Sequence, residues 1–417
     1  MKKSFWAAVL AGCALAPGLF GAEIIVSHLE LASRGAMEDG DFGIRTSAEA
    51  DISLQGGYKY GIILGLGAEI PNLQKALSYG RLELPYASTG STNPTTAEYD
   101  GLVDEVNERF NNQATLSIRS VAATVRELFG GPLEASFFIG HYDKLGSGED
   151  FQELFGSLPV TTDLRGFLYY PEGLGGDLSL RFNGAFHSIL GTGAALKAIF
   201  LEKVIPSLYI YHDLSFRNET TGAYLPGHYS ADFRLLVNSA AAKFEIFTGT
   251  TYVTGDDPVV RGGILAFFDA GSLALLMQAG VPYWEVGDDF DIDNWYFLLE
   301  PRFQLWRIGS ALTFFYHPVY YMNRLILDKD GDVERGKADV NFKIFYGDIN
   351  RSSFEGGVEA TLGLTLHNGE DISLWLSPFV QVAGAGLLWN FKLRFNALYF
   401  KEGGDFAEGF IGIRTAY

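Results

Sequence analysis

Charged residues that recur at every second position are the strongest chemical signal in this sequence. Within residues 42–70 no even position is charged, and five odd positions are charged: Arg45, Glu49, Asp51, Lys59 and Glu69. A repeat of two residues is the repeat of a β-strand with two different faces. Fixed acids and bases that face water set a field that acts on passing ions and charged solutes. The pattern therefore predicts selection by charge.

Other predicted strands carry charge on one face in the same way. The segments 178–187, 295–305, 358–366 and 389–399 each alternate apolar and polar residues. Their inner faces and those of neighbouring segments add eight residues to the predicted set: Arg119, Arg181, Arg234, Glu300, Arg302, Glu359, Lys392 and Arg394. Because unpaired charges are costly to bury in a dry core, the set as a whole predicts a water-filled interior. For any single residue, the alternative to a role in selectivity is that the position simply faces water and tolerates any polar side chain.

The first predicted hairpin can be given a register. A three-residue loop at Gln55–Gly57 would place Leu54 opposite Tyr58 and keep the apolar residues of both strands on one face. Gly57 would then take the positive φ that glycine adopts without strain. Pattern and turn chemistry thus agree on a two-faced hairpin.

The whole chain fits one repeated unit of strand and turn. It has 417 residues, and no linker or composition break divides residues 23–417 into separate domains. The predicted short connections are Gln55–Gly57, Phe129–Pro132, Pro171–Gly176, Ala270–Ser272, Arg307–Ser310 and Ala383–Gly386. The predicted long ones are 71–113, 143–161, 217–228, 254–260, 285–294, 322–338 and 401–407. Short turns on one side and long loops on the other are typical of an all-β, antiparallel, up-and-down transmembrane barrel. The strand count is even, about 20, with 18 as the nearest alternative.

The last strand carries a recognisable pattern. Ile411, Ile413, Thr415 and Tyr417 share one face, and the chain stops on an aromatic residue. This resembles the C-terminal signal strand of bacterial outer-membrane β-barrels, although Phe is the usual last residue. In pattern, residues 23–417 resemble outer-membrane porins and substrate-specific channels. The resemblance implies contact with outer-membrane lipid and recognition by the barrel-assembly machinery, and no family-specific motif adds site residues.

The first 22 residues predict export. Lys2 and Lys3 precede an apolar run from Phe5 to Leu15, and small residues follow near Ala22, as in a cleaved signal peptide. Lipidation of Cys13 is the alternative, because the residues before it resemble a lipoprotein cleavage box. The expected location is therefore the outer membrane of a Gram-negative bacterium.

Acidic loops and one long connection complete the prediction. The formal net charge is −19, which excludes nucleic acid as a partner. Acidic residues gather at 256–257, 288–293 and 328–334, and they predict a preference for cations over anions. A tight calcium site at 328–334 is less favoured because its spacing differs from an EF-hand. The 71–113 connection contains an amphipathic stretch at 97–112 that predicts a short helix, which either folds inward and narrows the pore or lies over the barrel rim.

Catalysis is not expected. None of the seven histidines lies in a catalytic signature, so no catalytic residue, cofactor or metal is predicted. The favoured function is a porin-like channel for small polar or charged solutes. The alternatives are a transporter of hydrophobic compounds with a plug and a non-conducting adhesin or structural barrel. The solute, the pore size and the oligomeric state stay open.

Overall fold

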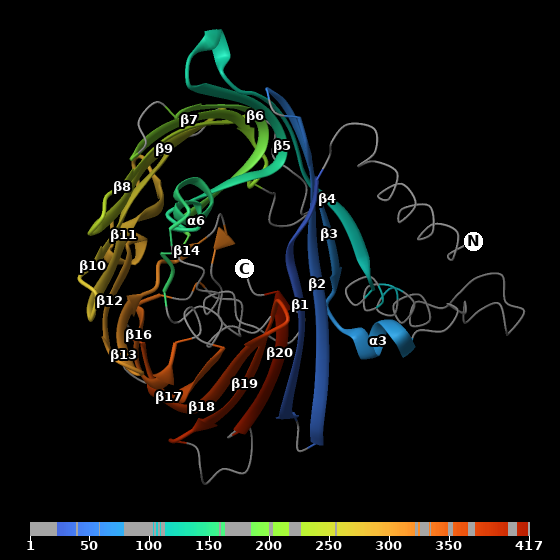
Figure 1. Cartoon of the computed structure of the whole chain (residues 1–417), viewed down its shortest axis with the longest axis vertical. Coiled ribbons are helices and arrows are strands. Elements are labelled where there is room, and N and C mark those ends of the chain that lie inside the picture. Colours follow the sequence, from blue (N-terminus) through green and yellow to red (C-terminus); the bar gives the residue numbers. More distant parts are fainter. Residues whose placement is uncertain are drawn as a thin grey trace, which may run out of the picture.

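The chain forms one closed ring of strands around a central space (Figure 1). The computed structural model describes residues 23–38, 41–57, 59–78, 103, 106, 109, 113–157, 160–162, 185–199, 203–216, 227–254, 257–321, 324–325, 333, 335–348, 353–365, 372–398 and 407–415. Among these residues, no helix has the length and apolar composition needed to cross a membrane.

The ring contains 18 strands, which is the lower of the two predicted counts. They are β1 (Glu23–Glu38), β2 (Asp41–Gly56), β3 (Tyr60–Ile70), β4 (Thr115–Val125), β5 (Leu133–Leu145), β6 (His187–Ala198), β7 (Val204–Asp213), β8 (His228–Asn238), β9 (Ala242–Val253), β10 (Val259–Asp269), β11 (Leu273–Glu285), β12 (Tyr296–Leu305), β13 (Ile308–Tyr316), β16 (Lys337–Gly347), β17 (Phe354–Thr365), β18 (Ile372–Gly384), β19 (Leu387–Asn396) and β20 (Ala407–Thr415).

Few other elements occur in the described part of the chain. The helices are α3 (Leu73–Ser78) and α6 (Asp150–Phe155), with short 3-10 turns η1 (Leu128–Gly130) and η4 (Ile292–Asn294). The strands β14 (Tyr320–Tyr321) and β15 (Arg324–Leu325) form a separate small sheet within the β13–β16 connection.

Antiparallel pairing between chain neighbours closes the ring. Each barrel strand pairs with the next one, and β1 pairs with both β2 and β20. Closure leaves no unpaired sheet edge, which is the condition for a β-structure in hydrocarbon. β5 pairs directly with β6, so no strand lies between them in the ring. Of the predicted strand at 178–187, residues 178–184 lie outside the described residues, and among 185–187 only His187 belongs to a strand.

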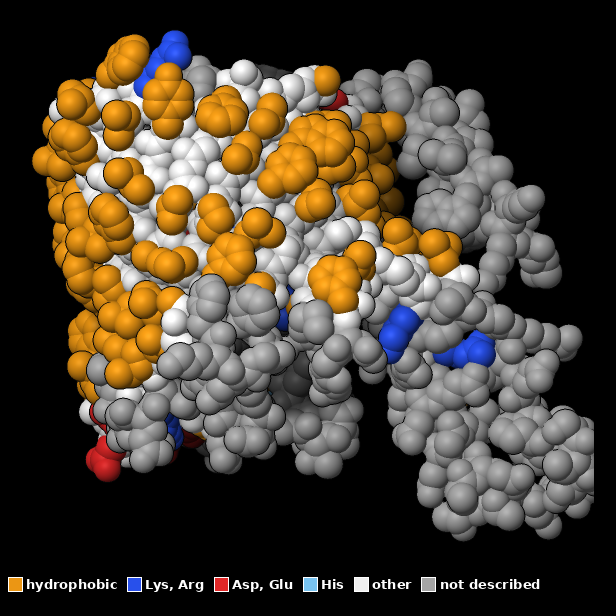
Figure 2. Space-filling model, turned by 90° about the horizontal axis from the view of Figure 1, so that it is seen from below, with side chains coloured by type: hydrophobic (Ala, Val, Ile, Leu, Met, Phe, Trp, Pro, Cys, Tyr) orange, Lys and Arg blue, Asp and Glu red, His pale blue; other side chains and the backbone are white. Residues whose placement is uncertain are grey.

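The outer wall of the ring is apolar. Large apolar side chains are exposed at many of the outward positions of the strands, and Ile118, Ile62 and Ile210 are 68%, 64% and 59% exposed. Figure 2 shows many apolar side chains on this surface, with backbone and uncharged polar groups between them and few charged groups. A soluble protein seldom exposes a continuous apolar surface of this extent. The predicted alternation and fold class are therefore confirmed.

The connections differ between the two ends of the ring. Short connections join the strands at one end, here called the turn end: 57–59, 126–132, 199–203, 239–241, 270–272, 306–307, 348–353 and 385–386. The opposite end, here called the loop end, has connections 39–40, 71–114, 146–186, 214–227, 254–258, 286–295, 317–336, 366–371 and 397–406. The predicted short turn Pro171–Gly176 lies outside the described residues, within the long β5–β6 connection.

The register of the first hairpin differs from the prediction. Leu54 pairs with Leu64 and not with Tyr58, and the turn consists of residues 57–59. Gly57 has the expected positive φ of 89°, but the chain reverses after it, and a Cβ there would lie 1.8 Å from the Tyr60 carbonyl oxygen. The shift is even-numbered, so every residue keeps its predicted face. Lys59 therefore lies in the turn and not on the wall.

The described start of the 71–113 connection lies outside the barrel. The Gln74 side chain on α3 bonds Thr46 on the outer face of β2, with a distance of 2.7 Å between Nε2 and Oγ1. Figure 1 shows α3 beside β2 and away from the central space. Val103, Val106 and Arg109 are helical, and most of the predicted helix at 97–112 lies outside the described residues. Whether that helix narrows the pore stays a prediction.

Candidate channel constriction

A segment of the β5–β6 connection folds into the ring. We call residues 146–157 and 160–162 the lumen segment; it contains α6, which lies inside the ring in Figure 1. Its ends bond two strands that β10 and β11 separate: Gly146 N donates to Glu245 Oε1 on β9 over 2.6 Å, and Thr162 Oγ1 donates to Glu300 Oε2 on β12 over 2.5 Å. The segment therefore lies against the inner face of β9 to β12.

Apolar side chains hold the lumen segment against the wall. Phe151 and Val160 from the segment are fully buried, as is Phe186 just before β6. They belong to one cluster with inward residues of β9 to β13, among them Phe247, Leu265, Leu276, Tyr296 and Leu298. Burying a side chain of this size contributes roughly 1.5–3 kcal/mol. Such packing makes the segment a fixed part of the barrel.

Close backbone contact also requires glycine within the segment. Gly148 has a φ of 70°, and a Cβ on it would lie 2.0 Å from the Val160 carbonyl oxygen. Any side chain at this position would push apart the two halves of the segment. The sequence therefore places glycine where the segment folds back on itself.

A buried ionic cluster fixes α6 to the wall. Arg234 on β8 is 1% exposed; its Nη1 lies 3.1 Å from Asp143 Oδ1, its Nε lies 2.7 Å from Glu245 Oε1, and it also pairs with Asp150 on α6. Lys197 Nζ lies 3.3 Å from the other Asp143 oxygen. We call these five residues the Arg234 cluster. Burial raises the pKa of the Asp150 carboxyl, and Asp143 adds to this rise, while Arg234 opposes it.

A second polar contact fixes the other end of the segment. Glu300 is fully buried, accepts bonds from Thr162 and from Thr313, and lies 2.6 Å from Arg302 Nη2. Arg302 also donates to the Thr161 carbonyl oxygen. A buried carboxylate with several donors is stable where an isolated one would not be. The two predicted residues Glu300 and Arg302 therefore act as an anchor for the lumen segment.

The wall formed by β16 to β20 carries paired charges. Lys343 Nζ lies 2.7 Å from Glu355 Oε1, and Lys392 Nζ lies 2.8 Å from Glu359 Oε2. Arg394 stacks 4.2 Å from the Trp375 ring and shares Glu408 with Arg34 of β1. These pairs are largely buried. The expectation that such charges must be wet is therefore wrong for this wall, because opposite charges compensate them.

The wall formed by β1 to β4 is more open. Arg119 on β4 lies 2.7 Å from Glu49 Oε1 and 3.0 Å from Asp51 Oδ2 on β2, and about a third of its side chain is exposed. Arg45 is exposed, and Glu69 faces Glu49 in the β2–β3 register. Inward charges with partial exposure border open space. This wall lies across the ring from the lumen segment (Figure 1).

The structure groups most of the predicted residues but leaves two apart. Arg234, Glu300 and Arg302 lie under the lumen segment, and the remaining inner-wall residues are Arg45, Glu49, Asp51, Glu69, Arg119, Glu359, Lys392 and Arg394. Lys59 lies in the turn, and Arg181 lies outside the described residues. For all of the predicted residues, a role in selectivity stays a prediction.

Sequence reasoning missed several charged residues. Glu245 alternates with outward apolar residues on β9, so the alternation of inward and outward positions could have identified it as an inner-wall residue. Arg261 shares the alternation of the inward residues Val259 and Leu265 on β10, whose pairing with β9 is unbroken, so it could have been found in the same way. The Arg261 guanidinium donates to both oxygens of Asp232, each over 2.7 Å, in a second buried cluster. Asp143 and Asp150 fell within a segment predicted to be an outer loop.

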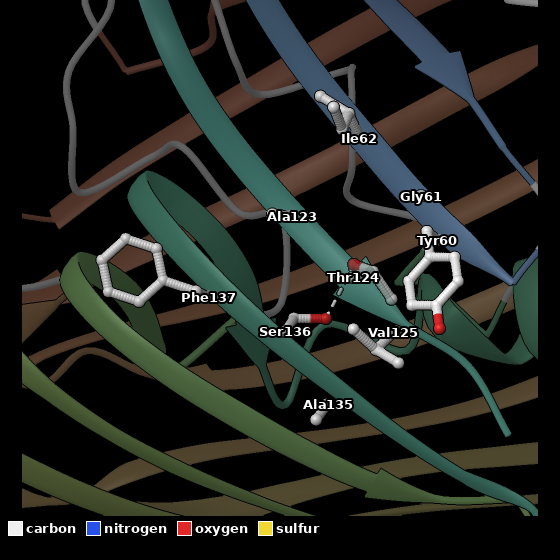
Figure 3. A pocket seen from close by; sticks show the side chains of 9 residues that line it. All are labelled: Tyr60, Gly61, Ile62, Ala123, Thr124, Val125, Ala135, Ser136 and Phe137. Carbon is white, nitrogen blue, oxygen red and sulfur yellow. Dashed lines mark hydrogen bonds between the residues drawn. The ribbon is translucent and has the colours of Figure 1, made fainter. Parts of the chain in front are cut away.

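One groove lies on the outer surface of the barrel and is not part of the lumen. It has a volume of about 470 Å³ and lies over β3, β4 and β5, where Tyr60, Ile62 and Phe137 border it (Figure 3). These three side chains are 70%, 64% and 53% exposed on the outer wall. In a membrane this groove would contact lipid. The groove therefore cannot form part of a channel through the ring.

The fold and the site together define a closed β-barrel of the transmembrane type with an inward-folded constricting segment. No protein-family description matches the chain, and no curated protein matches its sequence significantly.

Several solved structures have a similar fold. OccAB3 of Acinetobacter baumannii is 11% identical with a TM-score of 0.50, and the match covers 95% of this chain and 98% of that one. OpdL of Pseudomonas aeruginosa is 10% identical with a TM-score of 0.49, covering 94% and 98%. OccAB4 of Acinetobacter baumannii is 12% identical with a TM-score of 0.48, covering 93% and 97%. At 11% identity and a TM-score of 0.50, the likeness to OccAB3 concerns the fold alone.

Proposed function

We propose that this protein is an outer-membrane channel for small polar or charged solutes, with no catalytic activity. The observation that carries the proposal is the division of the strands into an apolar outer face and a charged inner face around a narrowed lumen. Solutes pass between the lumen segment and the wall of β1 to β4. Charged groups along this path favour hydrated, polar solutes over apolar ones.

The proposal includes an outer-membrane location in a Gram-negative bacterium. Ile411 on β20 is 51% exposed on the outer wall, as expected for a strand that the assembly machinery reads, and Ile413 shares its face. Tyr417, the signal peptide at 1–22 and Cys13 lie outside the described residues. Export by a cleaved signal peptide and recognition of the last strand therefore remain parts of the proposal.

Replacing residues 147–157 by a Gly-Ser linker of equal length is expected to raise single-channel conductance. The linker keeps the connection but removes α6 and its packing residue Phe151 from the lumen. We expect a rise of about twofold or more, because an unfilled barrel of this size encloses an aqueous channel. Conductance is measured on purified protein in planar bilayers.

A matched control keeps α6 in place. Gln152→Ala changes an exposed residue of the same helix and should leave conductance at the level of the unaltered protein. Equal conductance of the linker variant and the unaltered protein would contradict a constriction at this segment. Absence of any conductance in the unaltered protein would contradict the channel and favour an adhesin or structural barrel.

A further inference from the structure

Aromatic side chains from three distant parts of the chain meet inside the ring near the loop end. Tyr283 on β11 stacks on Tyr320 of β14, with 4.3 Å between the ring centroids, and the Phe216 ring, which follows β7, lies 6.5 Å from Tyr283. Figure 1 shows β14 within the ring. All three side chains are half-buried, so each keeps some exposed surface. We call these three residues the aromatic patch.

The aromatic patch lies on the loop-end side of the constriction. Tyr283 is five residues closer to the loop end of β11 than Gln278, whose amide donates to the Gly146 carbonyl oxygen of the lumen segment over 3.0 Å. Five residues of strand span about 17 Å, or roughly 12 Å along the barrel axis at a strand tilt of about 45°. A solute that enters from the loop end therefore meets the patch before the lumen segment.

A carboxylate borders the patch on β11. Glu285 lies on the inner face, because it pairs with the buried Val259 of β10, and its Oε2 accepts a hydrogen bond from the Tyr283 hydroxyl over 3.4 Å. Within the described part of the chain, no cation forms an ion pair with Glu285. A half-buried carboxylate beside aromatic rings offers its charge to a cation from outside the protein.

A second carboxylate adds negative charge behind the patch. Asp213, at the end of β7, is fully buried and accepts a hydrogen bond from Ser230 Oγ over 2.7 Å. Burial raises the pKa of the Tyr320 hydroxyl, and the charge of Asp213 adds to this rise, while Arg261 opposes it. The Arg261 guanidinium is itself held by both oxygens of Asp232. The surroundings of the patch therefore favour a positively charged visitor.

A buried nitrogen at the patch has no hydrogen-bond partner in the protein. The His228 ring stacks on Phe216 with 4.7 Å between the centroids, and its side chain is 7% exposed. Its Nδ1 makes no hydrogen bond. A buried polar atom without a partner is costly, so such an atom in a native structure calls for an explanation. A bound molecule that donates an N–H would supply the missing partner.

We propose that the aromatic patch, Glu285 and His228 form a binding site for small organic cations, such as a primary ammonium group on a short alkyl chain. The inference rests on the proposed channel function and names a solute class for it. Aromatic ring faces attract a cation, the Glu285 carboxylate pairs with it, and His228 Nδ1 accepts one of its N–H groups. The alkyl chain contacts the rings. Neutral and anionic solutes lack the first two interactions.

Block of single-channel current by three matched solutes tests the proposal. The solutes are n-butylammonium, 1-butanol and pentanoate, which carry the same butyl group with a positive, neutral and negative head. We expect butylammonium to reduce the sodium current at a concentration about tenfold or more below that of the other two, because they lack both the ring attraction and the pairing with Glu285. The half-blocking concentration is measured in planar bilayers.

Two variants locate the block. Tyr283→Leu removes a ring and keeps apolar volume, and Glu285→Gln removes the charge and keeps the shape, so each should raise the half-blocking concentration of butylammonium about threefold or more. The controls are Tyr252→Leu, an outward tyrosine that is 60% exposed on β9, and Glu127→Gln, an exposed glutamate at the turn end, and both should retain the block.

The outcomes separate the site from the channel. Equal block by the three solutes, or a block by butylammonium that survives both Tyr283→Leu and Glu285→Gln, would overturn the binding site and leave the channel standing. An unaltered protein that carries no current would overturn the channel, and the binding site with it.

Discussion

Replacing Arg234 by methionine is expected to lower the free energy of unfolding of the barrel by about 3–5 kcal/mol. The change keeps an aliphatic side chain but leaves three buried carboxylates, those of Asp143, Asp150 and Glu245, with Lys197 as the remaining cation of the cluster. Loss of the pair with Asp150 also releases α6 from the wall. We therefore expect a lower urea midpoint in lipid vesicles and a higher single-channel conductance.

Arg126→Met provides the control for this loss. Arg126 also pairs with a glutamate, Glu134 at 3.0 Å, but more than a third of its side chain is exposed. A partly exposed pair contributes about 0–1 kcal/mol, so this variant should unfold within that range of the unaltered protein. Equal stability of the two variants would show that the Arg234 cluster is not buried as described. Asp150→Asn tests the release of α6 in a variant that keeps Arg234.

Placing a charge on the outer wall is expected to have the second largest effect. Ile118→Arg puts a guanidinium where an apolar side chain is 68% exposed, near the middle of β4. A charged residue on the lipid face costs about 2–4 kcal/mol at the bilayer midplane and less near the interfaces. We expect a lower folded fraction and a lower urea midpoint after assembly into lipid vesicles.

The neighbouring residue provides the comparison. Ser117 occupies the inner wall, where its hydroxyl lies 3.4 Å from the Gly67 carbonyl oxygen, and it is exposed. Ser117→Arg should therefore change stability by no more than about 0.5 kcal/mol, as an ordinary exposed substitution does. An equal cost at both positions would contradict the assignment of lipid to one face and water to the other.

The two-faced strands were predictable because lipid and water impose opposite demands on adjacent residues. Phe297 and Phe303 on β12 are exposed on the outer face. Tyr296 and Glu300 on the same strand are buried on the inner face, as the sequence pattern predicts. The hairpin at 57–59 shows the limit of this reasoning. Alternation fixes which face a residue occupies but leaves the register free to shift by an even number.

The constriction was not predictable from periodicity. Phe151 and Val160 belong to a connection without a repeat, and their burial depends on apolar partners from β9 to β13, far away in the sequence. The prediction considered an inward fold for the 71–113 connection, whose described helix α3 lies outside the barrel. Both segments are long connections with some apolar residues. Only tertiary contacts show that residues 146–157 enter the ring.

A bulge limits how far the alternation can be followed along β4. The register shift between Ile118 and Ser120 changes the face on which the later residues of this strand lie. A bulge adds one residue to one strand and leaves little trace in the pattern of residue types. Arg119 kept its predicted face because the shift falls directly beside it.

Nitroxide labels walked along residues 42–54 of β2 in lipid vesicles measure the two environments most directly. Oxygen dissolves in lipid, and a charged nickel complex stays in water, so their collision rates with each label distinguish the two. The structure predicts strong oxygen contact at Ile44, Ile52 and Leu54, and nickel contact at Arg45, Glu49 and Asp51. Equal contact with nickel at both sets of positions would contradict a membrane-spanning barrel.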